Sequence, residues 1–136
     1  MERPLDGRLV LLAEDEVLIA LDIKQTLEDE EGAVVFLAST VLEALSKVDD
    51  PNLCAAILDH SFGVGNSSAV CEALKKRDIP FVNYTGHDHL TGPCDAGVLV
   101  QKPAPIEQLI ATVKSLVSPH VPKEVVSAAI DGSIAL

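Results

Sequence analysis

The sequence predicts a doubly wound α/β domain, in which a five-stranded parallel sheet of strand order 2-1-3-4-5 carries helices on both faces. Two observations support this fold class. Apolar stretches that suit strands alternate with helical patterns along the 136 residues. These apolar stretches also show little polar alternation, which is typical of strands buried on both faces of a sheet. Right-handed crossovers between such strands give the predicted order most simply.

The predicted strands are short runs rich in valine, leucine, isoleucine and alanine. They cover residues 8–13, 33–37, 54–58, 81–84 and 97–101. Turn-forming residues separate them, and Pro80 opens the fourth run. Each run has the usual length of a strand in a globular protein, so we expect five strands.

The helical patterns lie between these runs and after the last one. They cover residues 16–30, a segment that begins after Thr40, residues 67–77 and residues 105–117. Gly32 lies just past the first helix, where glycine commonly ends helices. Thr40 and Glu43 have the spacing of a capping box at the start of the second. Residues 86–96 hold two glycines, a proline and two aspartates, so we expect a shortened fourth helix there.

Length and composition indicate one globular domain. Residues 1–118 form the predicted domain, and residues 119–136 are a C-terminal tail with a possible short helix. Hydrophobic residues make up 48% of the chain, which is enough to build a packed core. The apolar stretches are shorter than the ~20 residues needed to span a bilayer. We therefore expect a cytoplasmic protein without a membrane partner.

The charge of the chain bears on its partners, and its cysteines bear on its compartment. The net charge is −11, and duplex DNA would be repelled by such a protein, so no nucleic-acid partner is expected. Cys54, Cys71 and Cys94 are odd in number and lack a CxxC spacing. We expect all three to be small, unpaired core side chains in a reducing compartment.

Polar residues follow four of the predicted strands at the point where each strand ends. Glu14 and Asp15 follow the first strand, Asp59 the third, Thr85 the fourth and Lys102 the fifth. Parallel strands place their carboxyl ends at one edge of the sheet, and ligands bind there at the switch point between strands one and three. We therefore expect these five side chains to meet.

The acidic part of this set suits magnesium and a phosphoryl group. The carboxylate of Asp59 can act as a nucleophile and hold a phosphoryl group as an acyl phosphate. Magnesium prefers hard oxygen ligands. Glu14, Asp15 and Asp59 can supply carboxylate oxygens, and the backbone carbonyl of Ser61 is a plausible fourth ligand.

The remaining two residues suit the phosphoryl oxygens. Lys102 offers a point cation, and Thr85 offers a hydroxyl. Each residue has an ordinary explanation when taken alone: a turn aspartate, an acidic helix start, a surface lysine or a strand threonine. Their occurrence together at four strand ends favours a common site.

These residues occur in segments that resemble the receiver domains of two-component response regulators, over about residues 6–118. The matching segments are VLLAEDE at 10–16, ILD at 57–59, YTG at 84–86 and QKP at 101–103. The resemblance implies a flavodoxin-like fold and a stand-alone response regulator. It also implies phosphorylation of Asp59 by a histidine kinase or a histidine phosphotransfer protein.

The same resemblance implies magnesium on Glu14, Asp15 and Asp59, with Thr85 and Lys102 as phosphoryl contacts. A cis peptide bond before Pro103 is also implied. No enzymatic activity is expected beyond phosphoryl uptake and autodephosphorylation. Only about 18 residues follow the predicted fold, so output is expected through a downstream protein target, from a monomer or a weak homodimer.

The sequence departs from the usual receiver pattern at Leu99 and near the fourth strand, among other positions. Many receivers carry an aromatic residue three positions before the lysine, where this chain has Leu99. Residues 80–86 resemble a receiver subgroup common in alphaproteobacteria, with the motif Pro-Phe-x-Phe-Ala-Thr-Gly-Tyr-Gly. The departures from that motif are Asn83, Tyr84, His87 and Asp88.

Two alternative functions fit parts of the pattern. A phosphatase of the haloacid dehalogenase type also uses an aspartate nucleophile and magnesium, but it needs a second aspartate where this chain has Ser61. A receiver-shaped interaction module that works without phosphorylation would fit the unusual segment 86–96. The presence of all the acceptor-site residues favours the phosphorylated receiver.

Overall fold

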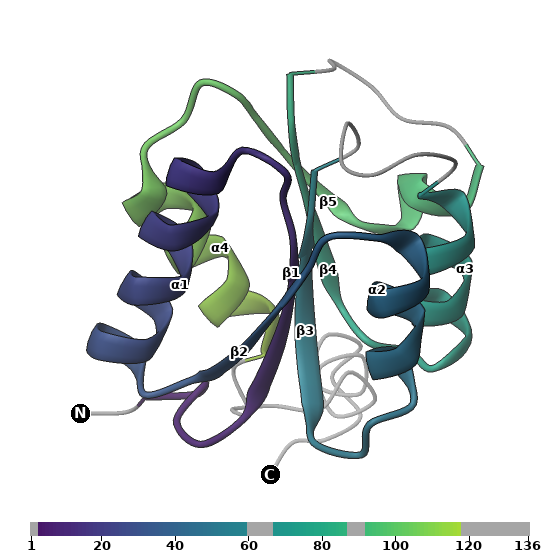
Figure 1. Cartoon of the computed structure of the whole chain (residues 1–136), viewed down its shortest axis with the longest axis horizontal. Helices are drawn as coiled ribbons and strands as arrows, with labels where there is room; N and C mark the ends of the chain where they lie inside the picture. The colour runs from purple at the N-terminus through teal and green to yellow at the C-terminus, as the bar shows by residue number, and fades with distance from the viewer. Residues whose placement is uncertain (1–2, 60–66, 87–91, 118–136) are drawn as a thin grey trace, which may run out of the picture.

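The computed structural model describes residues 3–59, 67–86 and 92–117, which form one sheet with helices on both sides (Figure 1). In chain order the elements are β1 (Leu9–Ala13), α1 (Val17–Glu31), β2 (Val34–Ala38), α2 (Val41–Val48), β3 (Leu53–Leu58), α3 (Ser68–Lys76), β4 (Phe81–Thr85), the 3-10 helix η1 (Gly92–Ala96), β5 (Val98–Gln101) and α4 (Ile106–Val117). Each strand and helix predicted before residue 118 is present, within one or two residues of its expected bounds.

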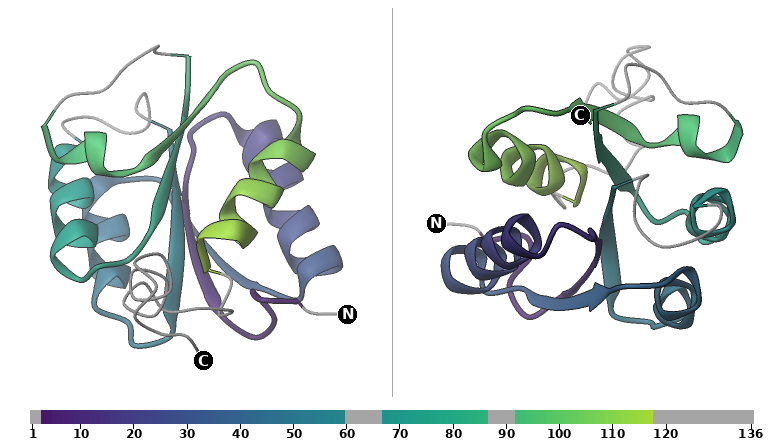
Figure 2. Two further views of the ribbon diagram at one scale, coloured as in Figure 1. Left: turned by 180° about the vertical axis from the view of Figure 1, so that it is seen from behind. Right: turned by 45° about the horizontal axis from the view of Figure 1, so that its top comes forward.

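The sheet is parallel throughout and has the order β2-β1-β3-β4-β5, so the predicted doubly wound, flavodoxin-like fold is confirmed. Helices α1 and α4 cover one face, and α2, α3 and η1 cover the other (Figure 2). Every residue of β1, β3 and β4 is buried, whereas the edge strands β2 and β5 are partly exposed. Burial on both faces explains why the central strands lack polar alternation.

Local sequence signals end and start the helices as expected. Gly32 follows α1 with a φ of 71°, a left-handed conformation that glycine adopts without steric cost. At the start of α2, the Thr40 hydroxyl accepts a hydrogen bond from the Glu43 amide at 3.0 Å. The Glu43 carboxylate accepts one from the Ser39 amide at 2.7 Å, one residue earlier than in the usual capping box. The shortened fourth helix is η1, which has five residues.

The cysteines correct one expectation. All three are buried, and Cys54 is a free thiol, but Cys71 and Cys94 form a disulfide. The prediction that all three are unpaired is therefore wrong. The disulfide joins α3 to η1 across 23 residues of sequence. Because β4 separates α3 from η1 in the chain, no local spacing of the two cysteines indicated the pair.

Some predictions fall on other parts of the chain. The tail at 119–136, with its possible short helix, and the backbone carbonyl of Ser61 lie outside the described residues. Within the described ranges, no helix is both long and apolar enough to cross a membrane.

Candidate functional site

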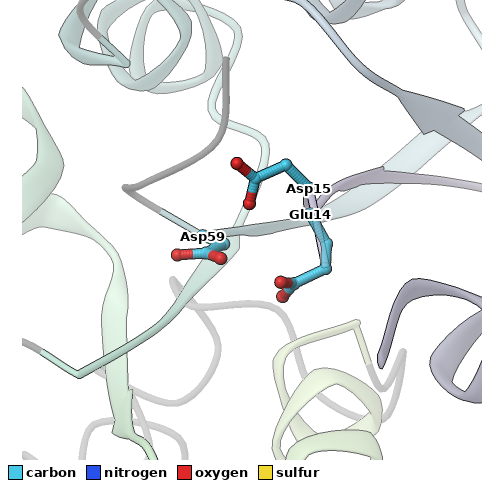
Figure 3. A group of neighbouring side chains, drawn as sticks. All are labelled: Glu14, Asp15 and Asp59. Carbon is cyan, nitrogen blue, oxygen red and sulfur yellow. The ribbon is translucent and has the colours of Figure 1, made fainter. Parts of the chain in front are cut away.

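The pairing of β1 with β3 brings the acidic residues together. Ala13 pairs with Leu58 at the last position of the ladder, and the Asp59 amide donates to the Ala13 carbonyl at 2.8 Å. Glu14 and Asp15 leave β1 at the same level as Asp59 leaves β3. Carboxylate oxygens of Glu14, Asp15 and Asp59 all lie within 4.8 Å of one another (Figure 3).

This group of oxygens has the chemistry of a magnesium site. Glu14 is 4% exposed and Asp59 3% exposed, while Asp15 is open to solvent. Buried carboxylates so close together repel each other, and a cation between them removes that cost. Three hard oxygen donors with one open side suit Mg²⁺, which keeps several of its waters when it binds protein.

Lys102, which follows the edge strand β5, brings an ammonium group to the same place. Its amide donates to the Thr85 carbonyl at 2.7 Å, which extends the β4–β5 ladder by one residue. Its Nζ atom lies 3.3 Å from carboxylate oxygens of Glu14, Glu16 and Asp59. The lysine therefore contacts the acidic group directly, and the peptide bond that follows it is cis, as the resemblance implies.

Thr85 lies at the carboxyl end of β4, beside the end of β5, and is 2% exposed. The structure thus gathers four of the five expected side chains: Lys102 contacts Glu14 and Asp59, and an oxygen of Asp15 lies within 4.8 Å of theirs. The fifth, Thr85, lies at the neighbouring strand end. The role of Thr85 as a phosphoryl contact stays a prediction.

Two further residues contact Lys102 without having been expected to. Glu16 forms an ion pair with it, and the ring of Tyr84 lies 5.0 Å from its Nζ atom. Glu16 belongs to the acidic run after β1, which was a usable signal. Tyr84 had only its place beside Thr85, since a tyrosine in a strand is ordinarily a packing residue.

The close charges shift two pKa values. Burial, together with the neighbouring Asp59, raises the pKa of Glu14 from 4.5 to about 7, although Lys102 opposes this shift. Burial alone would lower the pKa of Lys102, but the negative charges of Glu14 and Asp59 outweigh it and raise that pKa. At neutral pH, Lys102 is therefore a cation, and Glu14 is close to its titration midpoint without metal.

The titration of Glu14 predicts that magnesium binding depends on pH. Below pH 7 the metal must displace a proton from Glu14, so its apparent affinity should fall by up to about tenfold per pH unit. Glu14→Gln should bind magnesium more weakly and lose most of this slope.

In the metal-free protein the raised pKa of Glu14 means that the folded state holds the proton more tightly than the unfolded chain. Stability should then decrease as pH rises from 4.5 to about 7.

Magnesium binding can be followed by the fluorescence of Tyr84, because the chain has one tyrosine and no tryptophan. Titrations at pH 6, 7 and 8 of the original chain and of Glu14→Gln give the comparison. Equal slopes in the two proteins would show that Glu14 is not the group that competes with the metal.

The comparisons with known proteins agree with this fold. No protein-family model and no curated protein matches the sequence. Solved structures do match. The non-phosphorylated HemR receiver domain from Leptospira biflexa is 22% identical with a TM-score of 0.73, covering 85% of this chain and 98% of that one. A CheY-like response regulator receiver domain from Methanospirillum hungatei is 22% identical with a TM-score of 0.70, covering 93% and 100%.

A third match carries a metal. The receiver domain of the sensor histidine kinase PA1611 from Pseudomonas aeruginosa has a magnesium ion coordinated in its active-site cleft. It is 21% identical with a TM-score of 0.67, covering 82% of this chain and 98% of that one. Together these likenesses show that the chain has the fold of CheY-like response regulator receiver domains.

Proposed function

We propose that this chain is a phospho-accepting receiver of a two-component or phosphorelay system, in which Asp59 takes a phosphoryl group from a histidine kinase or a histidine phosphotransfer protein. The observation that carries the proposal is the position of Asp59. Its buried carboxylate lies 3.3 Å from the ammonium of Lys102, and one of its oxygens lies within 4.8 Å of carboxylate oxygens of Glu14 and Asp15. A nucleophile, a metal-binding oxygen group and a cation for phosphoryl oxygens thus share one site.

The reaction proposed is a single transfer. An oxygen of Asp59 attacks the phosphorus of the donor phosphohistidine, the P–O bond forms as the P–N bond breaks, and the imidazole leaves with the electron pair. Lys102 exchanges its contact with Asp59 for one with a phosphoryl oxygen and neutralises the charge that builds there. Glu14, Asp15 and Asp59 would hold a magnesium ion, which would supply further charge neutralisation. Later attack by water returns aspartate and phosphate.

An exposed apolar surface beside the site fits a protein donor. It consists of Val17, Leu18 and Leu21 on the first turns of α1, which are 68%, 82% and 51% exposed. This segment begins directly after Glu16, so a protein that docks on it reaches the carboxyl edge of the sheet. We assign this surface to the docking of the phosphodonor protein. We also expect the chain to signal through a downstream protein in the cytoplasm, and we expect no nucleic-acid partner.

The test is to find where phosphate is bound. The full chain is incubated with magnesium and a small phosphodonor such as acetyl phosphate, then reduced with borohydride and mapped by mass spectrometry. One phosphoryl group should be found, it should reside on Asp59, and chelation of magnesium should prevent it. Release of phosphate from a generic phosphomonoester would instead support the phosphatase alternative. Absence of any aspartyl phosphate, with histidine-kinase donors as well, would refute the proposal.

A further inference from the structure

The ammonium of Lys102 has to be held at a defined place for the site to work. Lysine has a long flexible side chain, and here three carboxylates compete for its ammonium, each with an oxygen 3.3 Å away. The hydrogen bond from the Lys102 amide to the Thr85 carbonyl fixes the main chain of Lys102, but it does not fix the far end of the side chain. Something else must fix the chain after it and the direction of its side chain.

Tyr84 contacts both the ammonium of Lys102 and the backbone that follows it. Its ring centroid lies 5.0 Å from the Nζ atom of Lys102, within the range of cation–π attraction. Its hydroxyl donates a hydrogen bond at 3.0 Å to the carbonyl of Ala104, two residues beyond the lysine. Tyr84 is 5% exposed and belongs to the core between the sheet and the layer of α1 and α4, so its ring cannot easily move.

The geometry points to Tyr84 as a positioning residue that fixes the ammonium of Lys102 over the acidic group by holding the β5–α4 turn and attracting the cation. This inference rests on the proposed function, because it gives Tyr84 a part in phosphoryl transfer through Lys102. Burial raises the pKa of the Tyr84 phenol, so its hydroxyl keeps its proton and continues to donate at neutral pH. Neither contact touches the nucleophile, and Tyr84 therefore acts only through Lys102.

A purely structural role is the competing explanation, since Tyr84 also fills the core. The two explanations differ in how Tyr84 and Lys102 depend on each other. If Tyr84 only packs, its loss affects the protein equally whether or not Lys102 is present. If it positions Lys102, its loss has no kinetic effect once Lys102 is gone.

The experiment is a double-mutant cycle on the full chain. Tyr84→Leu removes ring and hydroxyl, Tyr84→Phe removes the hydroxyl alone, and each is made with and without Lys102→Ala. With acetyl phosphate and magnesium, Tyr84→Leu should slow phosphate uptake by about tenfold and Tyr84→Phe by about threefold. In the Lys102→Ala background the same changes should alter the rate by less than about twofold.

Val100→Ala is the matched control. Val100 pairs with Tyr84 across β4 and β5, lies in the same core and has no polar group to offer Lys102. It should lower stability without changing the uptake rate of the folded protein. A tenfold slowing by Tyr84→Leu in both lysine backgrounds, or the same slowing by Val100→Ala, would overturn the positioning role.

Urea unfolding of the same six proteins separates this inference from the proposed function. If the original chain takes up no phosphate, the proposed function fails, but coupling between Tyr84 and Lys102 can still be measured from the unfolding free energies. Non-additive effects of the two substitutions would support the contact that positions Lys102. Additive effects would reject it, whatever the phosphorylation result.

Discussion

Asp59→Asn should abolish phosphate uptake, leaving no more label than a reaction without protein. The substitution keeps the size of a side chain that is 3% exposed, so the fold should persist. It removes the only atom proposed to attack phosphorus, because an amide oxygen does not form a stable acyl phosphate. It also removes one charge from the acidic group, so magnesium should bind about tenfold more weakly.

Asp15→Asn is the matched control, since it makes the same chemical change within the same group of oxygens. Asp15 is exposed and has a role only as a metal ligand in the proposal. Its loss should weaken magnesium binding, and added magnesium should restore phosphate uptake. Asp59→Asn should not recover at any magnesium concentration. Recovery of both variants, or of neither, would contradict the separate roles assigned to the two aspartates.

The same two variants address the interaction module that works without phosphorylation. Once a binding partner has been identified, its affinity for the original chain with and without a phosphodonor can be compared with its affinity for Asp59→Asn. A phosphorylated receiver should show a change with the donor that the variant lacks. A partner that binds all of these forms equally would favour the alternative.

The fold could be predicted because its signals are local and redundant. Each strand is an apolar run, each helix has an apolar face, and Gly32 and Thr40 mark boundaries by their own backbone chemistry. The chirality of crossovers then leaves few possible topologies. The proximity of Glu14, Asp59 and Lys102 followed from the topology alone, because parallel strands end at one edge. Membership of the alphaproteobacterial subgroup remains a prediction, since the comparisons do not bear on it.

The features that were missed depend on distances between elements. The disulfide between Cys71 and Cys94 depends on how closely η1 packs on α3. The contacts of Tyr84 depend on the path of the turn after β5, which brings the Ala104 carbonyl within hydrogen-bond distance of the Tyr84 hydroxyl. A pattern of residue types along the chain carries no information on either distance. The proximity of side chains that directly follow strand ends was thus predictable from the sequence. Contacts that depend on the path of a turn or on the packing of two helices were not.

Lys102→Ala should change phosphate uptake and magnesium binding in opposite directions. Phosphate uptake should fall by about 100-fold, a usual effect of losing one charged group that stabilises a transition state. Magnesium should bind about tenfold more tightly, because the ammonium no longer competes for oxygens of Glu14 and Asp59. Radiolabelled or mass-spectrometric uptake assays and Tyr84 fluorescence titrations measure the two quantities on the same protein.

Lys114→Ala provides a control of equal charge. Lys114 also pairs with a buried glutamate of another element, since its Nζ atom lies 3.3 Å from Glu31 between α4 and α1. Its loss should leave both quantities unchanged, because that pair is not part of the site. If Lys102→Ala weakened magnesium binding as well, the lysine would be acting mainly to hold the acidic residues in place. A fall in phosphate uptake together with tighter magnesium binding, in contrast, requires that the ammonium and the metal share the same oxygens. In that arrangement, Lys102 would be free to turn from the carboxylates to a phosphoryl group when magnesium is bound.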